Sequence, residues 1–208
     1  MILILKYSKI KVAKNICVWG ILWFVEEEKM EILDIVDENN ELINKKETRK
    51  YIHDNFLWHR HVSCWIINEN GEVLLQKRAA EKKRNPNMWS KTGGHVISGE
   101  EPIEALKREV YEELGIKIHE NDIILVGIHK SNDEKNRYFG YNFIVKTNYS
   151  IKEMKLQKEE VSDVKFISIE ELLNIKKNND INYTFNKWND KDFYEEIETI
   201  KRYIVFKE

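Results

Sequence analysis

The chain has 208 residues, of which 42% are hydrophobic, so it is long enough to form one domain with its own core. Its 34 basic and 36 acidic residues leave a net charge of -2, which argues against nucleic acid or a membrane surface as a partner. The two cysteines, Cys17 and Cys64, are far apart in apolar segments, so we expect neither a disulfide framework nor a zinc site. These features together predict a protein of the reducing cytoplasm.

The N-terminal segment is unusual because an apolar run at residues 16–25 follows a basic stretch at residues 6–14. The run is too short to span a bilayer, and three glutamates follow it where a secretory signal would have a small-residue cleavage site. Two interpretations stay open: the run adds a strand or helix to the domain, or the natural protein begins at Met30. We therefore divide the chain into an N-terminal extension, residues 1–29, and a domain at residues 30–208 that includes a C-terminal helix.

The remaining elements follow from hydrophobic periodicity and turn-forming residues. In chain order, we expect a strand at residues 32–36, a helix-compatible polar segment at 45–55, a hairpin of strands at 62–67 and 73–76, a basic loop at 79–87, an extended segment from 88 to the glycines at 93 and 94, and a helix at 103–114. Beyond these we expect strands at 123–128, 138–145 and 164–167, a short helix at 169–175 and a longer one at 191–204. Because strands and helices mix without regular alternation, the predicted fold class is α+β or a layered αβα sandwich.

One segment, GHVISGEEPIEALKREVYEELGI at residues 94–116, combines a predicted helix with an unusual acidic face. Pro102 suits the first turn of the helix, and Gly115 suits its C-terminal end. The apolar residues Ile103, Leu106 and Val110 recur at helical spacing and continue at Leu114, so they form one buried face.

The acidic face carries Glu109, Glu112 and Glu113 at positions i, i+3 and i+4, so the three carboxylates project from one patch. Like charges in this arrangement repel each other and destabilise a helix, unless a divalent cation lies among them. Oxygen-only ligands favour Mg²⁺ or Mn²⁺ over zinc. Arg108, eight residues after Glu100, is placed to tie the helix to the loop that begins at Gly94.

The same segment is similar to the Nudix signature, G-x5-E-x7-R-E-U-x-E-E-x-G-U, where U is a bulky aliphatic residue. Every fixed position is filled, by Gly94, Glu100, Arg108, Glu109, Val110, Glu112, Glu113, Gly115 and Ile116. The likeness extends over roughly residues 31–175. It implies the Nudix αβα sandwich, in which a mixed β-sheet carries the helix of this signature, the Nudix box helix.

The resemblance implies a metal-dependent hydrolase that cleaves the diphosphate linkage of a nucleoside diphosphate derivative or a related organic diphosphate. The residues that match the family's metal ligands are Glu109, Glu112, Glu113 and the backbone carbonyl of Gly94. Arg108 and Glu100 match residues that support the geometry of loop and helix. The reaction is the attack of water on a phosphorus atom, with metal ions neutralising the phosphate charge.

The proton acceptor for this water stays open among Glu112, Glu113, Glu159 and Glu160, and we include Glu160 with the catalytic candidates because family members often use a glutamate from beyond the box. Arg78 at a strand end and His95 beside Gly94 are candidates for substrate binding. A solvated strand end is the alternative for Arg78. We expect a small-molecule partner, with a homodimer as one candidate assembly.

Residues upstream of the box resemble one branch, the Nudix proteins related to isopentenyl-diphosphate isomerase. Shared features are the segment LDIVD at residues 33–37, Arg49, the pair His59–Arg60 and the segment QKR at residues 76–78. In the isomerase, histidines that match His59 and His95 belong to a second metal site, and a cysteine stands where this chain has Gly93. Hydrolysis is therefore favoured over an isomerase-like reaction, and a non-catalytic binding module of the same fold is the third alternative.

Overall fold

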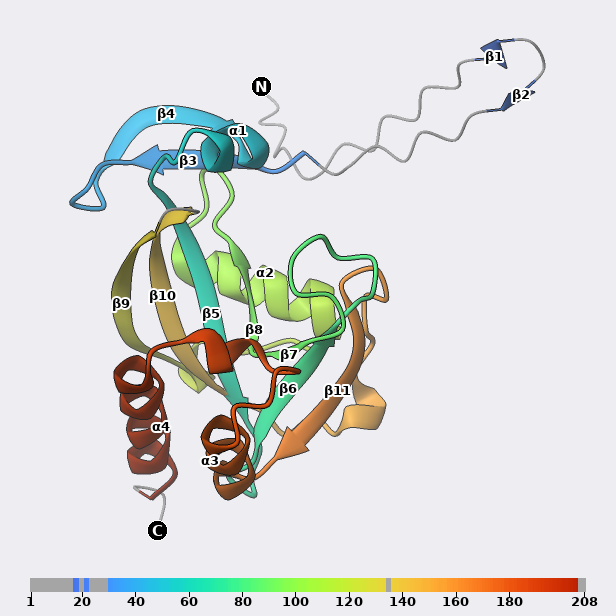
Figure 1. The fold of residues 1–208 in the computed structure, drawn as a ribbon, viewed down its shortest axis with the longest axis vertical. Coiled ribbons are helices and arrows are strands. Elements are labelled where there is room, and N and C mark those ends of the chain that lie inside the picture. The colour runs from blue at the N-terminus through green and yellow to red at the C-terminus, as the bar shows by residue number, and fades with distance from the viewer. Residues whose placement is uncertain (1–16, 19–20, 23–29, 134–135, 206–208) are drawn as a thin grey trace, which may run out of the picture.

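The computed structural model describes residues 17–18, 21–22, 30–133 and 136–205, and within these ranges a seven-stranded sheet forms its centre (Figure 1). The strands run in the order β11–β6–β5–β10–β9, while β7 pairs with β6 and β8 pairs with β5. Their bounds are β5 His59–Ile67, β6 Val73–Arg78, β7 Trp89–Ser90, β8 Thr92–His95, β9 Ile123–Asp133, β10 Asn136–Lys146 and β11 Val161–Ile167. Because β5 and β10 are parallel and the other pairs antiparallel, the sheet is mixed, as the Nudix resemblance implies.

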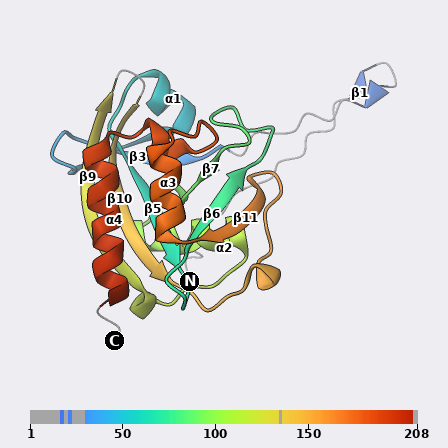
Figure 2. The same ribbon diagram turned by 60° about the horizontal axis from the view of Figure 1, so that its bottom comes forward.

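Helices cover both faces of this sheet, which confirms the αβα sandwich (Figures 1 and 2). The helix α2, Pro102–Leu114, packs on one face, where Leu106 and Val110 share a core with Val62 and Cys64 of β5. On the opposite face lie α3, Ile169–Lys177, and α4, Asp190–Val205. Short 3-10 turns occupy Glu120–Asp122, Ile151–Glu153 and Thr184–Lys187.

The box helix α2 begins and ends where its local sequence predicts. Pro102 occupies the first turn, and Glu101 and Glu104 form a capping box that satisfies backbone N–H groups at the N-terminus. Gly115 ends the helix in the left-handed region, with φ of 71°. Of its predicted apolar face, Leu106, Val110 and Leu114 are buried, whereas Ile103 is partly exposed.

A smaller unit precedes the main sheet and lies at one end of it (Figure 1). It consists of the antiparallel strands β3, Ile32–Val36, and β4, Leu42–Thr48, followed by the helix α1, Arg49–Asp54. The prediction of helix across residues 45–55 is wrong at its start, because residues 42–48 form a strand that pairs with β3. The helix begins only after Thr48, whose hydroxyl accepts a hydrogen bond from the backbone N–H of Tyr51.

Of the N-terminal extension, the structure describes only β1, Cys17–Val18, and β2, Ile21–Leu22, which pair as antiparallel strands. The rest of residues 1–29 lies outside the described residues, so both interpretations of that segment stay open. No helix in the described part of the chain is long and apolar enough to cross a membrane. The other predicted strands are confirmed, although β5 begins three residues earlier and β9 ends five residues later than expected.

Candidate active site

The glycine that opens the box lies directly against the first box glutamate. A Cβ atom at Gly94 would overlap the carboxylate of Glu109, so any larger residue there would displace that carboxylate. Glu109 is largely buried at this contact, and burial raises the pKa of its carboxyl group although Arg108 opposes the shift. The loop glycine and the helix carboxylate therefore form one wall of a site.

Arg108 joins the helix to the loop in the position that its spacing predicts. Its Nε donates a hydrogen bond to Oε1 of Glu100 at 2.8 Å, and its Nη2 donates to Oε2 at 3.0 Å. Nη2 also donates to the backbone carbonyl of His95 at 2.9 Å, and Nη1 donates to Oε1 of Glu109 at 2.5 Å. One guanidinium thus fixes the loop, the helix and the first box glutamate relative to one another.

Glu113 is the most deeply buried of the box glutamates, with 6% of its surface exposed. Its Oε2 accepts a hydrogen bond from Nε2 of Gln76 at 2.8 Å, and Oε1 of Gln76 accepts one from the hydroxyl of Thr92 at 2.9 Å. Burial, reinforced by the charge of Glu109, raises the pKa of Glu113 to about 8. Burial therefore outweighs the nearby arginine charges at Glu109 and Glu113, and a divalent cation bound here would favour the ionised form of both carboxyl groups.

Glu112 and Glu160 border these buried carboxylates. Glu112 is half-buried, with an oxygen 3.7 Å from Nη1 of Arg108. Glu160 lies in the turn before β11, forms an ion pair with Lys82 at 2.5 Å, and is close enough for its charge to raise the pKa of Glu113. The neighbouring Glu159 is exposed. The structure therefore brings Glu160 to the box.

Arg78 lies near enough to Glu113, Glu160 and two other arginines for their charges to act on it. Burial lowers the pKa of Arg78, and the charges of Arg49 and Arg84 act in the same direction, while Glu113 and Glu160 oppose them. Its Nε donates to the backbone carbonyl of Arg84 at 3.0 Å. These three guanidinium groups come from β6, α1 and the loop at residues 79–87. Together they place concentrated positive charge beside the acidic patch.

A cluster of histidines lies beside this patch. His53 of α1, His59 of β5 and His95 of β8 each offer a ring nitrogen, and these atoms lie within 4.8 Å of one another. The Nε2 atoms of His53 and His95 are 3.1 Å apart. Burial lowers the pKa of all three, that of His53 to about 4, so the rings are neutral at pH 7 and able to bind a metal ion.

Sequence reasoning named His59 and His95 but missed His53. His61 of β5 is not a member of the cluster. The ring of His61 instead packs edge-on against His95, with ring centres 5.3 Å apart. The signal for His53 was weak, because α1 is short and its face could not be assigned from the sequence.

Gly93 occupies the position of the isomerase cysteine. A Cβ atom there would overlap the backbone carbonyl of Val62 and stand 3.0 Å from Cα of Ser63 on the paired strand. A cysteine would therefore require the backbone of β8 to move away from β5.

The NUDIX domain family matches residues 57–188, which is more than half of the chain. The chain belongs to the Nudix hydrolases. It is 38% identical over 150 residues to an uncharacterised Nudix hydrolase of Clostridium acetobutylicum, a match that covers 68% of this chain and 72% of the relative. It is also 38% identical over 86 residues to the isopentenyl-diphosphate Delta-isomerase of Streptomyces avermitilis, covering 41% of this chain and 44% of the isomerase.

Solved structures agree with this assignment at the level of the fold. A protein of Deinococcus radiodurans superposes with a TM-score of 0.58 at 23% identity, covering 69% of this chain and 87% of the other. The MutT protein of Methanosarcina mazei superposes with a TM-score of 0.52 at 25% identity, covering 70% and 94%. As a Nudix hydrolase the chain is an enzyme of diphosphate hydrolysis, a class that acts with divalent metal ions.

Proposed function

We propose that this Nudix hydrolase uses Mg²⁺ or Mn²⁺ to cleave the diphosphate linkage of a nucleoside diphosphate derivative or a related organic diphosphate. The observation that carries the proposal is the pairing of a buried acidic patch with a cluster of arginines. Glu109 and Glu113 have raised pKa values, and the guanidinium of Arg78 lies near enough to act on the charge of Glu113. A negatively charged substrate and a divalent cation would together complement these two clusters.

Four groups would hold the metal: the carboxylates of Glu109, Glu112 and Glu113 and the backbone carbonyl of Gly94. All are oxygen donors, the ligands that Mg²⁺ and Mn²⁺ prefer. When bound, the divalent ion neutralises charge on the phosphate oxygens and lowers the pKa of a coordinated water. Arg108 would keep Glu109 in place through its hydrogen bonds to Glu100 and to the loop.

The chain's own residues would orient the substrate and accept the proton of the attacking water. Arg78, flanked by Arg49 and Arg84, suits a diphosphate group because a guanidinium can donate two parallel hydrogen bonds to one phosphate. His95 lies next to the box glycine and is a further candidate for a substrate contact. Glu160 is our candidate for the proton acceptor, because it comes from a separate turn and lies near enough to Glu113 for its charge to raise the pKa of that carboxyl group.

The experiment is a phosphate-release screen over a library of organic diphosphates in Mg²⁺ or Mn²⁺. We expect turnover that stops in excess chelator and returns when the metal is restored. Turnover that continues undiminished in chelator would contradict the metal-dependent reaction. A comparison of Glu160→Gln with Glu159→Gln then identifies the proton acceptor: we expect a large loss of kcat only for the former.

An isomerase-like reaction is the second candidate, and the cluster of His53, His59 and His95 is the observation that favours it. The complete Nudix box and the close fit of Gly93 against β5 argue against it. Incubation with isopentenyl diphosphate decides between the reactions, since isomerisation conserves the diphosphate and hydrolysis does not. Measurable turnover of any diphosphate would exclude a purely binding role. The cytoplasmic location and the homodimer stay predictions.

A further inference from the structure

The Nudix loop, residues 95–101, connects β8 to α2 and is held on two sides. On the helix side, its attachments come from residues of the Nudix signature. Glu100 receives two hydrogen bonds from Arg108 and accepts a third from the backbone N–H of Ile97 at 3.3 Å. These contacts fix the end of the loop that enters the helix.

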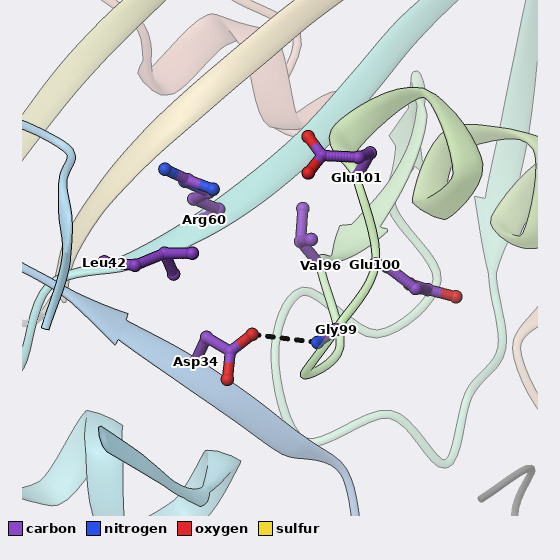
Figure 3. A pocket seen from close by; sticks show the side chains of 7 residues that line it. All are labelled: Asp34, Leu42, Arg60, Val96, Gly99, Glu100 and Glu101. Atoms are coloured by element: carbon purple, nitrogen blue, oxygen red, sulfur yellow. Dashed lines mark hydrogen bonds between the residues drawn. The ribbon is translucent and has the colours of Figure 1, made fainter. Parts of the chain in front are cut away.

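The second attachment comes from β3, outside the signature and outside the matched family domain at residues 57–188 (Figure 3). The hydroxyl of Ser98 donates to Oδ1 of Asp34 at 2.7 Å, and the backbone N–H of Gly99 donates to Oδ2 at 2.8 Å. The backbone N–H of Ser98 also donates to the carbonyl of Ile32 at 2.8 Å. Both carboxylate oxygens of Asp34 are therefore used by the tip of the loop.

Apolar packing fixes the middle of the loop, whereas the tip is held by hydrogen bonds to Asp34. Ile97 packs on the small core formed by Leu33, Ile35 and Ile52. At the tip, a cavity of about 80 Å³ separates the loop from the hairpin, with Leu42 and Arg60 on its far side (Figure 3). Gly99 has a φ of +83°, and a Cβ atom built on it would point into open space. The two hydrogen bonds of Asp34 thus replace the packing that the tip lacks.

We propose that Asp34 is a positioning residue, which fixes the tip of the Nudix loop and thereby holds Gly94 and Glu109 in the arrangement that binds the metal. Charged acceptors form stronger hydrogen bonds than neutral ones, so a carboxylate is suited to this task. The β3–β4 hairpin is then part of the framework of the active site. The inference rests on the proposed metal site at the Nudix box.

The test compares the full-length protein with Asp34→Ala, Asp34→Asn and Ser98→Ala. Hydrogen exchange of residues 95–101, measured without metal, reports the mobility of the loop, and a calorimetric titration with Mn²⁺ reports metal affinity. For Asp34→Ala we expect faster exchange and about tenfold weaker Mn²⁺ binding, since two hydrogen bonds to a charged group are lost. Asp34→Asn keeps one acceptor oxygen, so its loop exchange and its Mn²⁺ affinity should lie between those of the parent and those of Asp34→Ala. The double variant Asp34→Ala/Ser98→Ala should be no worse than Asp34→Ala, because both remove the same bond.

Asp37 provides the matched control, because it accepts backbone hydrogen bonds from Asn39 and Glu41 in the turn of the same hairpin. Asp37→Ala should lower the melting temperature and leave loop exchange and Mn²⁺ affinity unchanged. Equal weakening by the two alanine variants, or parental Mn²⁺ binding by Asp34→Ala, would overturn the proposal.

Should Asp34→Ala fail to fold, Asp34→Asn and Ser98→Ala carry the test with the same readouts. A parental protein that binds Mn²⁺ but cleaves no diphosphate would refute the proposed function alone, while one that binds no Mn²⁺ would refute both.

Discussion

The substitution Glu113→Gln tests two effects of this carboxyl group separately: the stability that it costs the folded protein and the contribution that it makes to catalysis. The folded protein holds this carboxyl group at a pKa of about 8, against the usual 4.5, because it is buried. The unfolded chain therefore ionises it at lower pH than the folded protein does. Between pH 4.5 and pH 8 the folded state binds more protons, so stability falls as the pH rises through this window and levels off above it.

The size of the effect follows from about 1.4 kcal/mol per pKa unit. At pH 7 the buried carboxyl group lowers the free energy of unfolding by on the order of 3 kcal/mol. For a domain of this size, that corresponds to a Tm lower by about 6–12 °C. Glutamine keeps the shape of the side chain and still accepts the hydrogen bond from Gln76. Without metal, Glu113→Gln should have a higher Tm than the parent at pH 7.5. Near pH 4.5 the two proteins should have the same Tm.

With Mg²⁺ the order should reverse, because a ligand that binds only the native state stabilises the parent more than the variant. Turnover should fall by roughly 10²–10³ or more, as when other preorganised charge-stabilising groups are removed. Glu112→Gln is the matched comparison: it should lose turnover similarly, but gain little in metal-free Tm because Glu112 is half-buried. Identical metal-free melts of parent and Glu113→Gln across pH 5–9 would refute the electrostatic reasoning, and parental turnover would refute the ligand role.

Three further predictions concern other parts of the molecule. Arg108→Gln should lose about 2–3 kcal/mol of stability without metal, because it leaves the Glu100 carboxylate without its charged partner; a melt equal to the parent's would contradict this. Arg78→Gln should raise KM for a diphosphate severalfold with an unchanged Tm, and an unaltered KM would assign Arg78 to the solvated strand end. A chain beginning at Met30 should fold and hydrolyse like the full protein; loss of soluble expression would show that the apolar run at residues 16–25 packs into the domain.

The sequence predicts best those parts of the fold that local residues determine. The box helix is a case, since Pro102 and Gly115 mark its ends and its apolar spacing selects the buried face. Strand β4 could not be predicted, because its sequence LINKKET is polar and six of its seven residues are exposed. Its extended shape depends on pairing with β3, which is a non-local interaction.

The same division applies to the site. The helical spacing of Glu109, Glu112 and Glu113 is enough to predict one acidic patch. The contact between Gln76 and Glu113 joins residues 37 positions apart, so no local pattern reports it. The approach of His53 to His95, 42 positions away, likewise depends on how α1 is placed at the end of the sheet.

The parallel pairing of β5 with β10 also bears on the order in which the protein folds. The hydrogen bond from Ser63 to Asn142 joins residues 79 positions apart, and the whole box lies between them. Phe143 and Val145 of β10 belong to the core on which the box helix packs. A nascent chain that has emerged only as far as the helix therefore lacks the part of this core that β10 supplies. Pairings of such long sequence separation form slowly, so we expect the box helix to dock on its complete core late in folding.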